Sequence, residues 1–247
     1  TDSEYGGAIT LDSEGNIVIA DVRTWSLSEE GLRSYLQSGV HIQKKSSSNG
    51  SFLNFDGSVH DQSPEFTSTS GSLAPAGNPH IASDNNGNIY VAITASEGVV
   101  DGYTIEHDND TIISKFDSSG NKEWTKILTG TTRSYYAWDR NNTDSVNDVP
   151  RAIIVGNDGF IYVSGKAGGV DLEFEGQSTQ LGGAYLTKLD NDGNKIWTRL
   201  FGPTYTQTQS YFGWGSSEIS IEVPHSIQPM ELVLSLIHIS EPTRRYA

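Results

Sequence analysis

The sequence predicts an all-β protein made of many short antiparallel strands, and three features support that class. The 247 residues include 26 glycines, and Asp, Asn and Ser are frequent in the segments between apolar runs. The runs are β-branched and aromatic, as in NIYVAIT, where Ile89, Val91 and Ile93 alternate with residues of the other face. Short alternating runs divided by glycine-rich turns are typical of all-β proteins.

These runs recur in an internal repeat of about 72 residues. A first motif occurs as LDSEGNIVIADV, SDNNGNIYVAIT and VGNDGFIYVSGK, with turn glycines Gly15, Gly87 and Gly159. A second motif follows in each copy, as IQKKSSSNGSFLNF, ISKFDSSGNKEWTKIL and LTKLDNDGNKIWTRLF, with turn glycines Gly50, Gly120 and Gly193. Two independent motifs in step over three copies establish a true repeat.

Each repeat is expected to form four strands. In the second copy these lie at about 79–83, 88–94, 111–116 and 122–128. The first and last pairs are joined by tight turns in which glycine takes a positive φ and Asp or Asn bonds the local backbone.

A four-stranded antiparallel unit of this size cannot bury both faces, and radial stacking of such units as propeller blades solves the problem. Trp124 and Trp197 are expected to fill the gap to the neighbouring blade. The sequence therefore predicts a β-propeller fragment. Its blades are expected at 1–73, 74–145 and 146–222, and a fourth begins at 223–233. Because three blades cannot close a ring, we expect the complete protein to carry more of them, and this chain alone to aggregate or unfold.

The first repeat departs from the others in its long connection. Ser26 and Glu29 have the spacing of a capping box, Leu32 and Leu36 are one helical turn apart, and Gly39 is a stop signal. This pattern predicts a short helix over roughly 28–37.

Residues 234–244 read LSLIHISEPTR, which resembles the translation of a transposon-based sequencing-library adapter. The alternative is a C-terminal strand, because LVLSLIHI is apolar. We expect the natural sequence to stop near Val233 and leave 234–247 out of every functional argument.

Composition excludes several functions. With 16 basic and 31 acidic residues the net charge is −15, which disfavours nucleic acid and anionic membranes as partners. No apolar run is long enough to span a bilayer. The absence of cysteine excludes disulfides, thiolate metal sites and a Cys nucleophile. The charge suits a protein that works outside the cell or on its surface.

A Pro-containing link precedes each first strand from the second repeat on, followed by His80, Arg151 or His225. The innermost strands of a propeller line its channel, so these three are expected near one mouth as a cationic collar for an anionic ligand. The alternative is that each side chain only hydrogen-bonds a neighbouring blade.

Aromatic inserts recur between repeats, as SYYAW at 134–138 and SYFGW at 210–214. Their equivalent residues are Tyr135 with Tyr211 and Trp138 with Trp214. Such loop aromatics could stack on sugar rings or on a protein partner, or could fold back as plugs over the groove between blades.

The acidic turns DNDGN at 190–194 and HDNDT at 107–111 leave calcium as an alternative to plain hairpin chemistry, although a downstream bidentate Glu is missing. No other cofactor and no metal site is predicted. There is no G-x-S-x-G, no H-E-x-x-H and no phosphate-binding loop, so no catalytic residue is assigned.

The pattern K-[FL]-D-x-x-G-N-K-x-W-T-[KR], with G-N-I-Y-V upstream, resembles the bacterial SBBP repeat family of seven-bladed β-propellers over 78–128 and 149–202, and less closely over 5–57. The resemblance implies an exported or surface-attached bacterial protein. We expect a non-enzymatic binding, adhesion or scaffold module for an unknown protein or carbohydrate ligand.

The alternative is a propeller enzyme whose active site lies mostly in missing blades. It would be a PQQ-type quinoprotein, or a polysaccharide lyase or hydrolase. LDNDGNKIW is also similar to the quinoprotein repeat, but is one residue shorter between Lys and Trp than its T-G-K-x-x-W signature.

Overall fold

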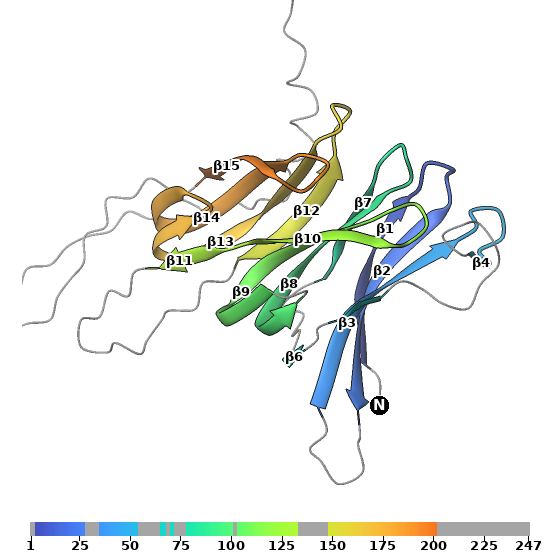
Figure 1. The fold of residues 1–247 in the computed structure, drawn as a ribbon, viewed down its shortest axis with the longest axis horizontal. Helices are drawn as coiled ribbons and strands as arrows, with labels where there is room; N and C mark the ends of the chain where they lie inside the picture. The colour runs from blue at the N-terminus through green and yellow to red at the C-terminus, as the bar shows by residue number, and fades with distance from the viewer. Residues whose placement is uncertain are drawn as a thin grey trace, which may run out of the picture.

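The computed structural model describes residues 3–27, 35–53, 65–67, 70–71, 78–100, 103–132 and 148–201. Throughout these ranges the regular structure is β-strand, with no helix, so the predicted all-β class is confirmed. The strands form three antiparallel sheets that lie side by side in chain order (Figure 1).

The first sheet is a meander of consecutive hairpins. Its strands are β1 (Ser3–Leu11), β2 (Ile17–Leu27), β3 (Tyr35–Lys45) and β4 (Phe52–Leu53), with β5 (Glu65–Thr67) also paired to β3. The second sheet follows the same order with β7 (His80–Ser83), β8 (Ile89–Val100), β9 (Tyr103–Phe116) and β10 (Lys122–Leu128). The third contains β12 (Val149–Val155), β13 (Ile161–Phe174), β14 (Gln177–Leu189) and β15 (Lys195–Phe201).

Two short strands link neighbouring repeats. β6 (Ser70–Gly71) lies in the segment predicted as the first blade but pairs with β8 of the second sheet. β11 (Gly130–Thr132) lies in the segment predicted as the second blade but pairs with the far end of β13. The predicted repeat boundaries at 73 and 145 therefore do not coincide with the edges of the sheets.

The predicted helix over 28–37 is wrong for residues 35–37, which belong to β3. Leu36 pairs with Ser26, the expected helix cap, inside a continuous antiparallel ladder between β2 and β3. This ladder gives the backbone of 35–37 its hydrogen-bond partners in the sheet, so a local capping pattern does not decide the structure here. Residues 28–34 lie outside the described part of the chain.

Two apolar clusters cover the opposite faces of the second sheet. The cluster shared with the first sheet contains Val18, Ala20, Ile42, Ile89, Val91, Ile93, Ala95, Ile105, Ile112 and Phe116. The cluster shared with the third sheet contains Ala82, Tyr90, Ala92, Ile113, Leu128, Ile153, Ile161, Val163, Ala167, Leu172, Phe174, Tyr185 and Leu189. Over residues 89–95 of β8, the odd-numbered side chains therefore pack toward the first sheet, and Tyr90 and Ala92 pack toward the third.

The hairpin turns that begin with Asp12, Asp84, Asp117 and Asp190 share one mechanism. In the turn at 84–88, Oδ1 of Asp84 accepts the backbone N–H of Asn86 at 2.9 Å and of Asn88 at 2.9 Å, while Oδ2 accepts the Asn88 side chain at 2.7 Å. The turn glycines named above, Gly15, Gly50, Gly87, Gly120, Gly159 and Gly193, all have φ between 73° and 83°. This left-handed conformation favours glycine because it has no Cβ.

The first strands of the three sheets lie next to one another. β7 contacts both β1 and β12, and the hydroxyl of Ser83 donates a hydrogen bond to the carbonyl of Leu11. These two residues are 72 positions apart, so equivalent points of successive repeats touch directly. β12 further contacts β8 and β9 of the second sheet.

Candidate functional site

The structure brings together two of the three members of the predicted cationic collar. His80 on β7 is half-buried and hydrogen-bonds the backbone of Pro150 at the start of the third sheet, next to the exposed Arg151. Burial lowers the pKa of His80, the Pro150 bond opposes this, and the nearby charge of Arg151 lowers the pKa further. His80 therefore bonds the neighbouring sheet, the alternative considered for it. His225 lies outside the described residues.

The predicted aromatic platform cannot be placed, because all of its members fall outside the described residues. They are Tyr135, Trp138, Tyr211 and Trp214. Their proposed contact with sugar rings or a partner stays a prediction.

The acidic turn at 190–194 is closed by its own hydrogen bonds. Oδ1 of Asp190 accepts the backbone N–H of Asp192 at 3.0 Å and of Asn194 at 2.7 Å, and Oδ2 accepts the Asn194 amide at 3.0 Å. These donors, the Asn194 side chain first, lower the pKa of the Asp190 carboxyl. Within the described ranges, no three His, Asp or Glu residues gather in a way that could hold a metal ion.

The turn at 190–194 instead docks onto the second sheet. Tyr90 places its hydroxyl 3.0 Å from a carboxylate oxygen of Asp84 and 2.8 Å from the side-chain oxygen of Asn191. The Asn191 carbonyl accepts the indole N–H of Trp124 at 3.1 Å and lies 3.5 Å from Nζ of Lys115. Trp124 thus lies in the groove between two sheets, with its ring 6.3 Å from that of Tyr90.

Trp197 occupies the equivalent position in the third sheet. Its ring lies 6.3 Å from that of Tyr162 and 5.7 Å from the guanidinium of Arg199, both in its own sheet. Trp124 and Trp197 therefore repeat the same packing against a tyrosine of the second strand.

A buried polar contact that sequence reasoning missed also joins the second and third sheets. The Thr111 hydroxyl donates to the carbonyl of Asp148 at 2.9 Å and lies 2.9 Å from the Tyr185 hydroxyl. The N–H of Asp148 in turn donates to the carbonyl of Asn109 at 2.8 Å. Burial raises the pKa of Tyr185 far above its usual range, so its phenol stays neutral.

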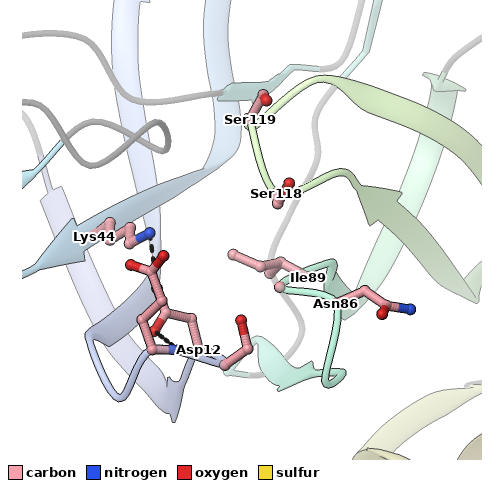
Figure 2. A pocket seen from close by; sticks show the side chains of 9 residues that line it. Asp12, Lys44, Asn86, Ile89, Ser118 and Ser119 are labelled. Carbon is pink, nitrogen blue, oxygen red and sulfur yellow. Dashed lines mark hydrogen bonds and ion pairs between the residues drawn. The ribbon is translucent and has the colours of Figure 1, made fainter.

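A polar pocket of about 280 Å³ opens between the first and second sheets (Figure 2). Its lining consists of Asp12, Ser13, Glu14, Lys44, Asn86, Gly87, Ile89, Ser118 and Ser119. Across it from Ser118 and Ser119 lies a buried ion pair, with Nζ of Lys44 2.8 Å from Oδ2 of Asp12 and side-chain exposures of 8% and 4%.

The Asp12 carboxylate stays ionised in this pocket. Burial on its own would raise its pKa, but hydrogen bonds from Lys44 and from the backbone and side chain of Asn16 outweigh it, so the pKa is lowered. The pocket therefore keeps a full ion pair on one wall at neutral pH.

Comparisons with known proteins identify no relative: no protein-family model and no curated protein matches the chain. Across the described ranges, the structure contains no helix of the length and apolar character needed to cross a lipid bilayer.

Proposed function

We propose that the three sheets are blades of a β-propeller that acts as a non-enzymatic binding or scaffold module of a secreted or surface-attached bacterial protein. The observation that carries the proposal is an exposed apolar face on the first sheet. Its equivalents in the other two sheets are buried or partly buried against a neighbouring sheet.

This leading face is defined by four positions that recur at 72-residue intervals. They are Ile9, Leu11, Ile17 and Ile19 in the first sheet, Ile81, Ser83, Ile89 and Val91 in the second, and Ile153, Val155, Ile161 and Val163 in the third. Ile89 and Ile161 are 1% and 0% exposed because the preceding sheet covers them.

On the first sheet Ile9 is 66% and Leu11 57% exposed, and Ile17 and Ile19 are partly exposed. Phe52 on β4 is also 51% exposed. In the other two sheets, the equivalent positions pack against the opposite face of the preceding sheet. The repeat therefore predicts that the exposed face of the first sheet also packs against a sheet of the same kind. Successive stacking with adjacent first strands supports a ring in which a further repeat covers the first sheet.

The assembly is tested by light scattering on the full chain. An uncovered leading face makes the chain associate as concentration rises, and Ile9→Lys suppresses that association because it places a charge in the apolar contact. Ser47→Lys adds the same charge on an exposed turn and leaves association unchanged. A chain extended by further copies of its repeat becomes monomeric. A chain that stays monomeric at all concentrations contradicts ring closure through this face.

The binding role is tested separately with the extended, ring-closed protein on arrays of glycans and cell-surface proteins. Tyr135→Ala combined with Trp138→Ala is expected to abolish the signal, while Ser47→Lys preserves it. Turnover of an arrayed polysaccharide would instead favour the enzyme alternative.

A further inference from the structure

The pocket between the first and second sheets lies at a place that larger side chains occupy in the next interface. Strand register makes the comparison direct, because Lys44 pairs with Val18 and Leu53, whereas Lys115 pairs with Tyr90 and Trp124. The two lysines are therefore equivalent, and so are the residues on either side of them.

Three side chains that fill the second interface are smaller in the first. The replacements are Val18 for Tyr90, Leu53 for Trp124, and Ser118 for Asn191. In the second interface these groups bond one another through the Tyr90 hydroxyl and the Trp124 indole. In the first interface both groups are missing, and the turn at 117–121 meets the first sheet across open space (Figure 2).

Because the first sheet has Val18 in place of Tyr90, the charged side chains near the two lysines also pair differently. Lys115 pairs with Glu123 at 2.7 Å, and Asp84 binds the Tyr90 hydroxyl. Lys44 instead turns to Asp12, the equivalent of Asp84, and holds it at 2.8 Å. The first interface thus presents a paired cation and anion to the pocket where the second has a phenol.

The lining is dense in hydrogen-bonding groups. Lys44 has three ammonium hydrogens, one of which is directed to Asp12. Ser118 and Ser119 add hydroxyls from the facing turn, and the backbone N–H of Ser119 donates to the Asp117 carboxylate within that turn. Ile89 also lines the pocket, but its side chain is only 1% exposed, so the accessible lining is mainly polar.

Charge and size limit what this space can hold. The Lys44 charge is already neutralised by Asp12, and Glu14 adds a further negative charge, so an anion is disfavoured. The described part of the chain offers no three-ligand group for a metal ion. A volume of about 280 Å³ is close to the small end of ligand pockets, which begin at roughly 300 Å³.

We propose that this pocket binds one neutral polyhydroxylated unit, such as a single sugar residue of a glycan. The donors and acceptors of Lys44, Asp12 and the two serines match the hydroxyl groups of a sugar ring. The pocket lies between the first and second sheets, so its binding test does not depend on association through the exposed face of the first sheet.

The experiment measures binding of small probes to the full chain by saturation-transfer NMR and calorimetry. The probes are glucose, galactose, mannose, N-acetylglucosamine and myo-inositol, with glucuronate and glucosamine as charged counterparts. At least one neutral probe is expected to bind one site with a Kd of about 1–10 mM. Glucuronate is expected to bind at least 10-fold more weakly than its neutral parent, glucose.

A filling variant tests the location. Val18→Tyr with Ser118→Asn introduces two of the three larger side chains of the second interface, so it is expected to weaken binding at least 10-fold and to retain the β-sheet circular dichroism. Ser119→Asp is the second variant, because it places a carboxylate in the pocket without altering the core. Its matched control, Asp192→Ser, makes the reverse change in the equivalent exposed turn and leaves affinity unchanged.

Two results overturn the proposal. One is the absence of saturable binding by every neutral probe up to about 100 mM, which corresponds to less than about 1.4 kcal/mol of favourable free energy at a 1 M standard state. The other is binding that survives both the filling variant and Ser119→Asp at unchanged affinity, because the probe would then occupy another place.

Discussion

Removing the Tyr90 hydroxyl isolates the polar contact between the second and third sheets. Tyr90→Phe changes little volume, so the effect comes from the hydrogen bonds. The hydroxyl lies 3.0 Å from Asp84 and 2.8 Å from Asn191, and the side chain is only 1% exposed. A buried bond to a charged group contributes about 1.5–3 kcal/mol. We therefore expect the free energy of unfolding to fall by about 2 kcal/mol.

Tyr162 provides the matched control, because it occupies the same register position in the third sheet. Its hydroxyl donates to Asp158 at 2.7 Å within its own sheet, in an exposed contact. Water replaces such a bond, so Tyr162→Phe is expected to cost about 0.5 kcal/mol or less. Both variants are measured by urea unfolding, followed by circular dichroism and by tryptophan fluorescence. Equal losses at the two positions would refute the assignment of the Tyr90 hydroxyl to sheet docking.

Three further outcomes follow from the same interfaces. Gly193→Ala is expected to destabilise the protein about 1 kcal/mol more than Gly15→Ala. Both glycines have a positive φ, but only at Gly193 would the added Cβ come within 3 Å of a neighbouring side chain. Equal chemical denaturation midpoints for the two variants would contradict this expectation. Burial lowers the pKa of His80 from its ordinary 6.5, so its contribution to stability is complete above about pH 6.5 and is lost as pH falls through the lower pKa of the folded state. His80→Gln should therefore reduce the dependence of the melting temperature on pH between pH 7 and 5. An unchanged dependence on pH counts against this role of His80. Lys44→Met should lower the free energy of unfolding in urea by about 3 kcal/mol, because it leaves Asp12 buried without its cation. Adding Asp12→Asn to this variant should recover most of that loss of stability. A double variant as unstable as Lys44→Met would argue against a coupled pair.

Features that repeat along the chain were predictable from sequence, because the same motif in one repeat supports the strand and turn predicted at the equivalent positions of the others. The hairpin turns, the strands of the second repeat and the inward position of Trp124 all follow from motifs in register. The repeat also predicts which residues of β8 alternate between two neighbours, since period-two patterning is a direct consequence of strand geometry.

The features that sequence reasoning missed depend on contacts between repeats. The helix pattern around Ser26 and Leu36 is a local signal, and the long β2–β3 ladder overrides it. The pocket arises from small side chains in one copy of the repeat. Its signal was present in the change from GNIY to GNIV, which places Val18 where the second repeat has Tyr90. Only the pairing of β3 with β2 and β4 shows that this change lies beside Lys44.

The strand exchange by β6 and β11 has a consequence for how the chain comes apart. Each of these short strands is covalently part of the segment before it but hydrogen-bonded to the sheet after it. Tension applied along the chain must therefore strip an outer strand from one sheet before its predecessor can separate. Cutting the gene at the visible motif boundaries would leave each excised unit with an unsatisfied edge. A unit that carries a complete sheet begins with the linking strand, β6 or β11. Duplication of this architecture must therefore copy a segment that starts before the boundaries of the sequence motifs.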